Sequence, residues 1–600
     1  MSFMFHPYPY VDHDAVNPVS GRGVLPVRGV IPVAKKIAAL LKEGKNIGVD
    51  AYPGADTHIL LNVLRQAGAG VSYEVIDAES LLKDPGEITE MLKPYLPEDR
   101  EEDPVLLYGR RYEGGYRGLQ NGEKVNALKE KLGASRAVLV IGRGALAPEL
   151  RDCFDLRVWM DITPRTAALN FKYGHARNIG AQEDLPYGLL MRRNYYVDFE
   201  LGVNTRWELI RSGKLDLYIT ADVPEEMQMV TCSELNILFS EICERPFRCR
   251  PVYLEGVWGG FYIHRQRHLP KEMKNCAWIF DLIPMEVSIV AKLGEAEFEA
   301  PFFTFIQMMG EKLLGRQAYE QFGGYFPVRF NYDDTYHSNG NMSIQCHPDA
   351  EYVMKNHNEL GRQDESYYVC VTAQGAKTFL GFKDETSCGA FFEEARRAEK
   401  THELIDYEKY INAVPSVPGT QLMIPAGTVH ASGRNQVILE IGSLTVGSYT
   451  YKLYDYQRID PQTGLPRPIH LKMGSRVIHG ERTGSWVRDN LVNHGGIVRE
   501  GKDKNGNPWK EIIAGEHELL YFSLRNLIFW DRIEDDTDGL FHVLALVDGE
   551  KVRISSVEDP SKSFIINSLE IAVVPASLGK YTIENLGIGS VTVHKTQIKR

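Results

Sequence analysis

The segment "NMSIQCHPDAEY", residues 341–352, decides how the middle of this chain is expected to fold. In a β-strand, side chains two positions apart point to the same face. Ser343, Gln345 and His347 therefore share one face, and the residues between them point to the other. Pro348 has no backbone N–H to donate, so it ends the strand or marks its rim. The pattern predicts a strand with a polar Ser-Gln-His face.

Two further segments supply residues that suit this face. "QDESYYV" contains Glu365, and "IPAGTVHA" contains His430. Two histidines and one carboxylate, with one position open, form a common catalytic metal arrangement. The carbonyl oxygen of Gln345 would add a weaker, neutral ligand, and the mixed N and O set suits Zn²⁺, although Mn, Co or Fe could occupy it. Ordinary surface or core roles are the alternative for such residues, because short motifs match by chance.

We expect ordinary surface or core roles for five other histidines: His264, His268, His337, His357 and His470.

The chain divides into three predicted parts. Residues 1–235 alternate short apolar strands with helices, which is typical of βαβ units on a parallel sheet. The strands expected there include "PVLLYG" (104–109). Residues 236–485 have amphipathic strands with helical inserts, and residues 486–600 are nearly all strand and turn. The length of 600 residues fits several domains.

An internal echo links the last two parts. "MIPAGTVHASG" (423–433) recurs weakly as "VVPASLGKYTI" (573–583), which suggests two related all-β modules. Lys580 stands in the second copy where His430 stands in the first. We therefore expect the C-terminal module to lack a metal site.

Composition limits the possible partners. The net charge is −12, whereas nucleic-acid binders show a basic domain or stripe. The eight cysteines form no CxxC pair, which favours reduced thiols over a zinc ribbon or a disulfide scaffold. Neither a signal peptide nor a run of about 18 apolar residues is present. We expect a cytoplasmic protein that binds neither nucleic acid nor membranes; the oligomeric state is left open.

The middle and end of the chain, about residues 250–600, resemble the type I mannose-6-phosphate isomerases, which are zinc-dependent cupins. The motifs that carry the resemblance occur in the family's order: "SIQCHPDAEY", "ESYYVCV", "PAGTVHA", "LEIG" and "TYKLYDYQR". "GRQAYEQFGGYFPV" and "TFLGFK" also look like family segments. The resemblance implies cupin jelly-roll domains with a helical insert, and one Zn²⁺ per chain held by Gln345, His347, Glu365 and His430.

The resemblance also implies a reaction, the interconversion of mannose 6-phosphate and fructose 6-phosphate through an enediol. A Lewis-acidic metal stabilises the developing enediolate oxygen. A carbon acid beside a carbonyl needs a positioned base. Glu440, in "VILEIGS", is our candidate because the family carries an active-site acid there; a salt-bridged strand glutamate is the alternative. Lys452 is the second candidate catalytic residue.

The substrate phosphate needs cations and hydroxyl groups. Ser343, Lys452 and Arg458 are the candidates, with Arg458 able to grip an oxyanion through two parallel bonds. Three positions depart from the family: Lys452 replaces an arginine, Gln363 replaces a lysine, and Asn331 stands where a strand lysine is usual. These departures leave the preferred sugar phosphate open.

The N-terminal part resembles uridine-kinase-like P-loop proteins in "NIGVDAYPGADTHILLNVL" and "VLVIGRGALAPELRDCFDLRVWMDITP". A phosphate-binding loop needs a Gly-Lys pair before its hydroxyl residue. Asp56 and Thr57 stand in place of that pair, and Arg143 stands where a metal-holding acid is often found. The resemblance therefore implies a degenerate kinase-like domain, inactive in phosphoryl transfer; an unrelated α/β domain is the alternative.

Three functions thus compete. The first is a zinc-dependent sugar-phosphate isomerase, acting on mannose 6-phosphate or on another sugar phosphate. The second is a bifunctional enzyme with an active kinase domain, against which the missing lysine argues. The third is a metal-binding sugar-phosphate sensor without turnover.

Overall fold

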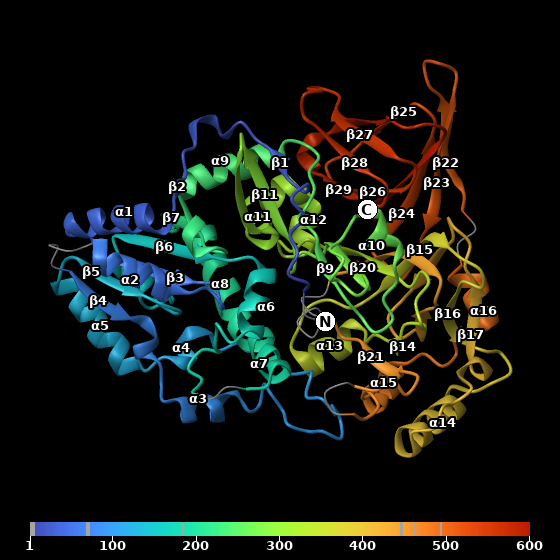
Figure 1. Ribbon diagram of the computed structural model, residues 1–600, viewed down its shortest axis with the longest axis horizontal. Helices are drawn as coiled ribbons and strands as arrows, with labels where there is room; N and C mark the ends of the chain where they lie inside the picture. The colour runs from blue at the N-terminus through green and yellow to red at the C-terminus, as the bar shows by residue number, and fades with distance from the viewer. Residues whose placement is uncertain (1–6, 68–72, 183–184, 445–447, 461–463, 493–494) are drawn as a thin grey trace.

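The computed structural model describes residues 7–67, 73–182, 185–444, 448–460, 464–492 and 495–600. The chain is multidomain and built from sheets and helices. In Figure 1 an α/β layer (blue to cyan) lies beside a middle region of strands (green to orange), and a C-terminal β-sandwich (red) packs above that region. The predicted division at residues 235 and 485 stays a prediction.

The α/β layer contains one mixed sheet. In the described part of the chain its strand order is β2-β8-β7-β6-β3-β5-β4. The strands from β7 to β4 pair in parallel, whereas β8 and β2 are antiparallel additions at one edge. The strand bounds are β2 Val27–Arg28, β3 Ile47–Ala51, β4 Glu74–Asp77, β5 Val138–Ile141, β6 Leu156–Asp161, β7 Leu217–Thr220 and β8 Gln228–Thr231.

Helices connect these strands. In α1, apolar residues recur at the three- and four-residue spacing of one helix face, from Val33 to Leu41, and that face is buried. The bounds are α1 Val30–Lys42, α2 Thr57–Ala67, α3 Pro85–Leu92, α4 Gly115–Leu119, α5 Gly122–Ala134, α6 Pro164–Lys172, α7 Tyr187–Arg193, α8 Phe199–Arg211 and α9 Cys232–Cys243. A π-helical turn, Asn194–Asp198, joins α7 to α8.

The prediction of a strand at residues 104–109 is wrong. This apolar segment leaves the sheet and packs against the middle region instead. The Tyr108 N–H donates to the Asp103 carboxylate (2.6 Å), and the Tyr108 hydroxyl donates to the Thr450 carbonyl (2.6 Å). The Arg192 guanidinium donates to the Tyr108 carbonyl (2.8 Å). Side chains therefore satisfy backbone groups that a sheet neighbour would otherwise pair.

The middle region contains two antiparallel sheets whose inner faces meet. Their orders among the described residues are β18-β15-β20-β13-β10-β9 and β17-β16-β19-β14-β21. The bounds are β9 Val252–Leu254, β10 Trp278–Leu282, β13 Val328–Asp334, β14 Ile344–Cys346, β15 Glu365–Thr372, β16 Lys377–Phe382, β17 Ile411–Pro415, β18 Gln421–Ile424, β19 His430–Ser432, β20 Gln436–Ser443 and β21 Tyr451–Tyr454.

A small sheet and several helices surround this sandwich. The small sheet has the order β1-β11-β12, so the start of the chain joins the middle region. Its bounds are β1 Asn17–Pro18, β11 Ser288–Leu293 and β12 Ala296–Pro301, and the helices are α10 Tyr262–Gln266, α11 Phe302–Leu314, α12 Arg316–Gln321, α13 Ala350–His357, α14 Cys388–Thr401, α15 Leu471–Val477 and α16 Gly484–Asn490.

The C-terminal part is a second sandwich, with described orders β22-β23-β24-β31-β26-β29 and β25-β30-β27-β28. Lys580, the counterpart of His430 in the sequence echo, begins β30 and is exposed. The bounds are β22 Ile497–Lys502, β23 Pro508–Gly515, β24 Phe522–Phe529, β25 Arg532–Asp536, β26 His542–Asp548, β27 Lys551–Ser556, β28 Ser563–Asn567, β29 Ile571–Val574, β30 Lys580–Asn585 and β31 Val591–Ile598.

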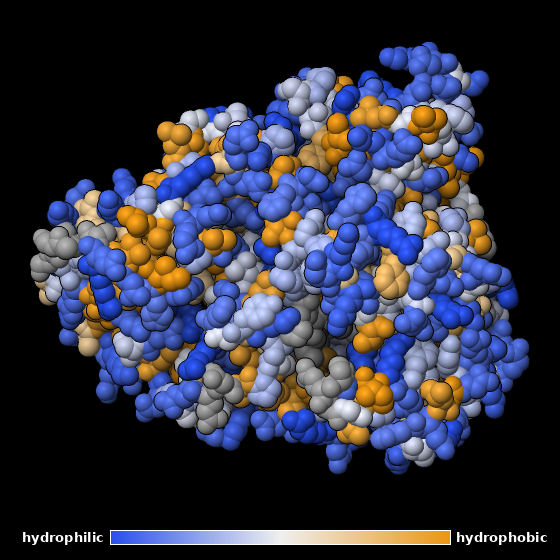
Figure 2. All heavy atoms as spheres, viewed as in Figure 1, coloured by the Kyte–Doolittle hydropathy of each residue, from blue (hydrophilic) through white to orange (hydrophobic). Residues whose placement is uncertain are grey.

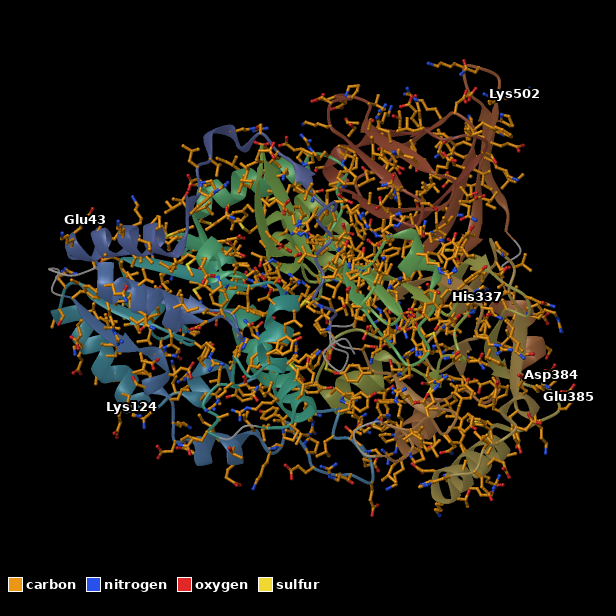
Figure 3. All side chains as sticks on the ribbon, viewed as in Figure 1. Glu43, Lys124, His337, Asp384, Glu385 and Lys502 are labelled. Carbon is orange, nitrogen blue, oxygen red and sulfur yellow. The ribbon has the colours of Figure 1, made fainter. Side chains whose placement is uncertain are left out.

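On the face in Figure 2, hydrophobic residues are scattered among hydrophilic ones. The six polar side chains labelled in Figure 3 are exposed. Among the described helices, none has both the length and the apolar character that crossing a bilayer requires.

A buried ion pair ties the α/β layer to the middle region. The Arg206 guanidinium on α8 donates to both oxygens of Asp161 at the end of β6 (2.9 and 3.0 Å). The same carboxylate accepts from the Tyr218 hydroxyl (2.7 Å) and from Thr304 on α11 (2.8 Å). Because α11 belongs to the middle region, this carboxylate fixes how the two parts meet.

Replacing Arg206 with alanine should destabilise the protein by about 3–5 kcal/mol, because it leaves a buried carboxylate without its cation. The measurement is the urea midpoint, followed by circular dichroism. Arg316→Ala is the control, since Arg316 forms only an exposed pair with Glu320. Equal midpoints for the two variants would contradict the role of the pair.

Candidate metal centre

Four predicted ligands converge between the two sheets of the middle region. Gln345 on β14 and His430 on β19 are direct neighbours in one sheet, and Glu365 begins β15 in the other. The Nε2 atoms of His347 and His430 are 3.2 Å apart. The Glu365 oxygens lie 3.1 Å from the first and 3.3 Å from the second. The Gln345 amide lies 3.3 Å from His430 Nε2.

Backbone carbonyls fix both imidazole rings. His347 Nδ1 lies 3.0 Å from the Tyr449 carbonyl, and His430 Nδ1 lies 2.9 Å from the Thr428 carbonyl. A carbonyl only accepts, so each Nδ1 carries the proton and each Nε2 presents a lone pair to the centre. The tautomer is thereby set for metal binding.

The donor set fits a divalent cation. Two lone pairs and a carboxylate meet at about hydrogen-bond distance, with no proton available between the two rings. Glu365 Oε2 is buried and accepts no hydrogen bond. Gln345 can turn its carbonyl oxygen toward the same point, because its amide rotates about a soft torsion. An N and O set with a free position is the pattern of catalytic zinc.

The ionisation states agree with this assignment. Burial lowers the pKa of His347, against the opposing effect of Glu365, so the ring is neutral at neutral pH. The Arg329 guanidinium donates to Glu365 and favours the ionised form of this buried carboxylate. A neutral imidazole and an ionised carboxylate are the forms that bind metal.

Two neighbours orient Glu365. Arg329 on β13 donates to Glu365 Oε1 (2.8 Å), and Gln363 donates to the same oxygen (2.9 Å). The Gln363 carbonyl oxygen in turn accepts from the Tyr449 N–H (2.8 Å). Gln363 stands where the resembling family has a lysine, and here it positions the candidate metal ligand Glu365.

Glu440, the predicted base, lies on β20 beside a second carboxyl group. Burial, followed by the charges of Glu365 and Asp333, raises the pKa of Glu440 well above its usual range. Burial likewise raises the pKa of Asp333 to about 7. Arg329 reaches toward this pair, with its guanidinium 3.5 Å from Glu440. Such a shifted carboxyl beside a metal site is suited to proton transfer near neutral pH.

The predicted phosphate residues separate in space. Ser343 and Lys452 line the cavity that contains the metal ligands, and Arg458 does not. The Arg458 guanidinium is bound to Asp455 (2.7 Å) and to the Asn341 carbonyl. Arg467, which the sequence analysis missed, lines the cavity in its place.

Asp455 holds this cluster together. Its Oδ1 accepts from the Ser343 hydroxyl (2.7 Å), and its Oδ2 lies 3.0 Å from the Arg467 guanidinium. Lys452 pairs with Gln345 across β14 and β21, so it lies next to the metal ligands. Burial, aided by Arg467, lowers the pKa of Lys452 to about 8.

The cavity around these residues has a volume of about 930 Å³. Gln345, Glu365, Glu440 and Lys452 line it together. His470, given a structural interpretation in the sequence, also lines it, and its Nε2 lies 3.3 Å from Asp103. One cavity therefore joins two of the four candidate metal ligands, Gln345 and Glu365, with the shifted carboxyl group and a cation.

Two functional candidates escaped the sequence analysis. Arg329 is in the segment "FPVRFNYDD" (326–334), two residues before Asn331 and on the same face of β13. Asn331 itself donates to Asp333 (2.8 Å). The sequence could have identified Arg329, because side chains two positions apart in a strand point to the same face. Arg329 thus places a cation on the face where the family lysine, replaced here by Asn331, would lie. No local pattern marked Arg467.

Comparisons with known proteins agree with part of the sequence interpretation. The chain is 25% identical over 238 residues to the mannose-6-phosphate isomerase of Streptococcus mutans, which covers 38% of this chain and 67% of the relative. It is 28% identical over 235 residues to the mannose-6-phosphate isomerase ManA of Bacillus subtilis, covering 39% and 68%. The chain is thus similar to mannose-6-phosphate isomerases over part of its length.

A solved mannose 6-phosphate isomerase from Bacillus subtilis aligns with 59% of this chain and 100% of its own, at 20% identity and a TM-score of 0.44. Residues 33–244 match a family model described as a domain of unknown function (DUF8485). The resemblance of the N-terminal part to P-loop kinases stays a prediction.

The geometry predicts about one zinc ion per chain after dialysis against a zinc buffer, because the buried donors form a single centre. His430→Ala should lower the bound zinc to near zero and remove the gain in thermal midpoint that zinc gives the parent. The measurements are elemental analysis and thermal denaturation.

His337→Asn is the control, because His337 is exposed (Figure 3) and its positive φ of 58° suits asparagine. It should bind zinc like the parent protein. Full zinc content in His430→Ala would refute the assigned centre.

Proposed function

We propose that this protein is a zinc-dependent aldose–ketose isomerase that interconverts mannose 6-phosphate and fructose 6-phosphate. One observation carries the proposal: Glu365, a member of a buried group of metal-type donors, lines the same cavity as a carboxyl group of raised pKa and a buried lysine. The similarity to mannose-6-phosphate isomerases supports the substrate.

The metal ligands are Gln345, His347, Glu365 and His430. Zinc, when bound, supplies a Lewis acid for the oxygen on which negative charge develops. Arg329 and Gln363 hold Glu365 in place, and the carbonyls of Tyr449 and Thr428 hold the two rings. The centre is therefore preorganised by groups that do not need to move during the reaction.

Glu440 carries the proton between the two neighbouring carbons. In its ionised form it removes the proton from the first carbon, and in its neutral form it returns the proton to the second. Asp333 raises the pKa of Glu440, and Arg329 opposes that rise. The three groups thus adjust the proton affinity of Glu440 toward the working pH.

Lys452 and Arg467 bind the substrate phosphate, whereas the Ser343 hydroxyl donates its one proton to Asp455 and so positions that carboxylate. Asp455 fixes Ser343 and Arg467 at the edge of the cavity. Arg458 supports Asp455 from the other side, and this contact favours an indirect role for it. A flexible lysine and an arginine fork together match a phosphate dianion.

The N-terminal α/β layer does not transfer phosphoryl groups in our proposal. The loop after β3 is packed rather than open: a Cβ at Gly54 would meet Ala167 at 3.2 Å, and Asn170 donates to the Gly54 carbonyl (2.9 Å). Asp56 caps the start of α2 by accepting from the His58 N–H (2.9 Å). A carboxylate there repels a phosphate group.

Purified protein should convert mannose 6-phosphate to fructose 6-phosphate, lose this activity with a chelator and regain it with zinc. Glu440→Gln mimics the neutral carboxyl group, so zinc content and folding should persist while kcat falls about 10²–10⁴-fold. Glu500→Gln, at an exposed strand position, is the control. Zinc-loaded protein without turnover would favour the sensor.

Lys452 should make substrate binding depend on pH. A lysine is charged below its pKa and loses its charge as the pH rises through about 8. The KM should therefore rise about tenfold between pH 7 and 9, and Lys452→Arg should flatten this rise because arginine stays charged. A parallel rise in both proteins would exclude Lys452 as the titrating group.

Titration with millimolar ATP and Mg²⁺ should give no binding heat, because the loop after β3 lacks a lysine and is packed against α6. Mannose 6-phosphate, titrated into the same preparation, is the positive control. ATP binding that survives saturation with mannose 6-phosphate would revive the bifunctional enzyme.

A further inference from the structure

The α/β layer builds one wall of the cavity that holds the metal centre. Tyr108, Lys172, Tyr187 and Tyr195 from this layer line the same cavity as Glu365 and Glu440. The Tyr108 hydroxyl donates to the Thr450 carbonyl, which anchors the wall on the middle region. Substrate in this cavity therefore lies between two parts of the chain.

The carboxyl edge of the parallel sheet lies next to this wall. Tyr52 directly follows β3, and Pro164 begins α6 after β6; both line a smaller cavity of about 50 Å³. The two cavities share lining residues, so they are adjacent: Pro7, Tyr195, Phe280, Met285 and Glu286. In open α/β sheets, ligands bind outside the carboxyl ends of the strands. Here that edge faces the metal centre of another part of the chain.

Tyr195 is held firmly at the junction. It lies in the π-helical turn Asn194–Asp198, and such turns are frequent at functional sites. The Asp198 carboxylate fixes the turn by accepting from the Ile179 N–H (2.9 Å) and from Asn178 (3.1 Å). The Tyr195 hydroxyl donates to Glu359 (3.1 Å).

The cavity lining is rich in aromatic residues. Its aromatic residues are Tyr8, Tyr108, Tyr173, Tyr187, Tyr195, Trp258, Trp278, Phe280, Phe303, Tyr325 and Phe326. The ionisable residues on the far sides of both cavities are Arg165, Lys172, Glu200, Glu255 and Glu286. This charge does not favour a second phosphate. Aromatic rings with polar tips instead suit a neutral ring that has an apolar face and hydroxyl groups.

The cavity is also large for a monosaccharide phosphate. Its volume of about 930 Å³ lies near the top of the roughly 300–1,000 Å³ range of pockets that bury drug-sized ligands. A hexose phosphate is smaller than such a ligand. With the phosphate on Lys452 and the reacting carbons at the metal centre, the space along the α/β wall stays unused.

We propose that the substrate is a hexose 6-phosphate that carries a second, uncharged sugar ring, and that the α/β layer binds this ring through Tyr187 and Tyr195. The inference rests on the proposed isomerase function. Carbons 1 and 2 react and O6 carries the phosphate, so the second ring is attached at O3 or O4. The reaction itself is unchanged: one hydrogen moves from carbon 2 to carbon 1, and one proton moves from O2 to O1.

The experiment compares mannose 6-phosphate with its 4-O-mannosyl derivative, phosphorylated on the reducing ring. Aldose and ketose are followed by NMR, so no coupling enzyme limits the substrate. We expect kcat/KM at least about tenfold higher for the disaccharide, which is worth about 1.4 kcal/mol of binding to the distal ring. Tyr187→Ala and Tyr195→Ala should each lower the disaccharide-to-monosaccharide ratio about tenfold.

Tyr73→Ala is the matched control, because Tyr73 is a half-buried tyrosine of the same layer outside the cavity lining. It should leave the ratio unchanged. Both kcat/KM values are measured on the same preparation of each variant. A loss of correctly folded protein therefore lowers both values equally and does not change their ratio. A ratio near or below one in the parent protein, with normal turnover of mannose 6-phosphate, overturns the inference alone.

Loss of turnover for both substrates overturns the proposed function instead. Calorimetry of the zinc-loaded protein then still decides the inference. Tighter binding of the disaccharide phosphate, weakened in Tyr187→Ala, supports the distal site, and equal affinities for the two phosphates reject it.

Discussion

Two lone pairs that face each other at 3.2 Å are the constraint on which the rest of this structure depends. The rings of His347 and His430 cannot share a proton, since each Nδ1 is already committed to a backbone carbonyl. Such an arrangement is unfavourable in a dry interior unless a cation joins it. The two sheets of the middle region meet around this point, and the surrounding polar groups serve to hold the carboxylate of Glu365 there.

The sequence predicted the residues around this point best where the two-residue alternation of a strand was enough to place them on one face. Gln345 lies in β14, Ser343 and His347 directly flank this strand, and Ser343 and Gln345 both line the cavity, as a period of two predicts. β14 has neighbours on both sides that fix its orientation. Motif order placed Glu365 and His430 in the same centre. These residues depend on short-range geometry and on a family pattern.

Prediction was weaker where long-range contacts decide. The apolar run at 104–109 has the composition of a strand, yet its hydrophobic surface is used against another part of the chain. Local sequence also does not show which group a long arginine side chain contacts. Arg458 donates to Asp455, whereas Arg467 lines the cavity. The apolar run contacts a residue 342 positions away, and Arg458 donates both to Asp455, three positions away, and to the Asn341 carbonyl, 117 positions away.

The contact between Tyr108 and Thr450 joins residues 342 positions apart, and that between Asp103 and His470 spans 367. Synthesis proceeds from the N-terminus, so the α/β layer emerges long before the strands it must cover. Until those strands arrive, the apolar segment at 104–109 has no surface to pack against. Assembly of the cavity is therefore a late event with high contact order, slow by nature and dependent on an N-terminal layer that waits in a partly exposed state.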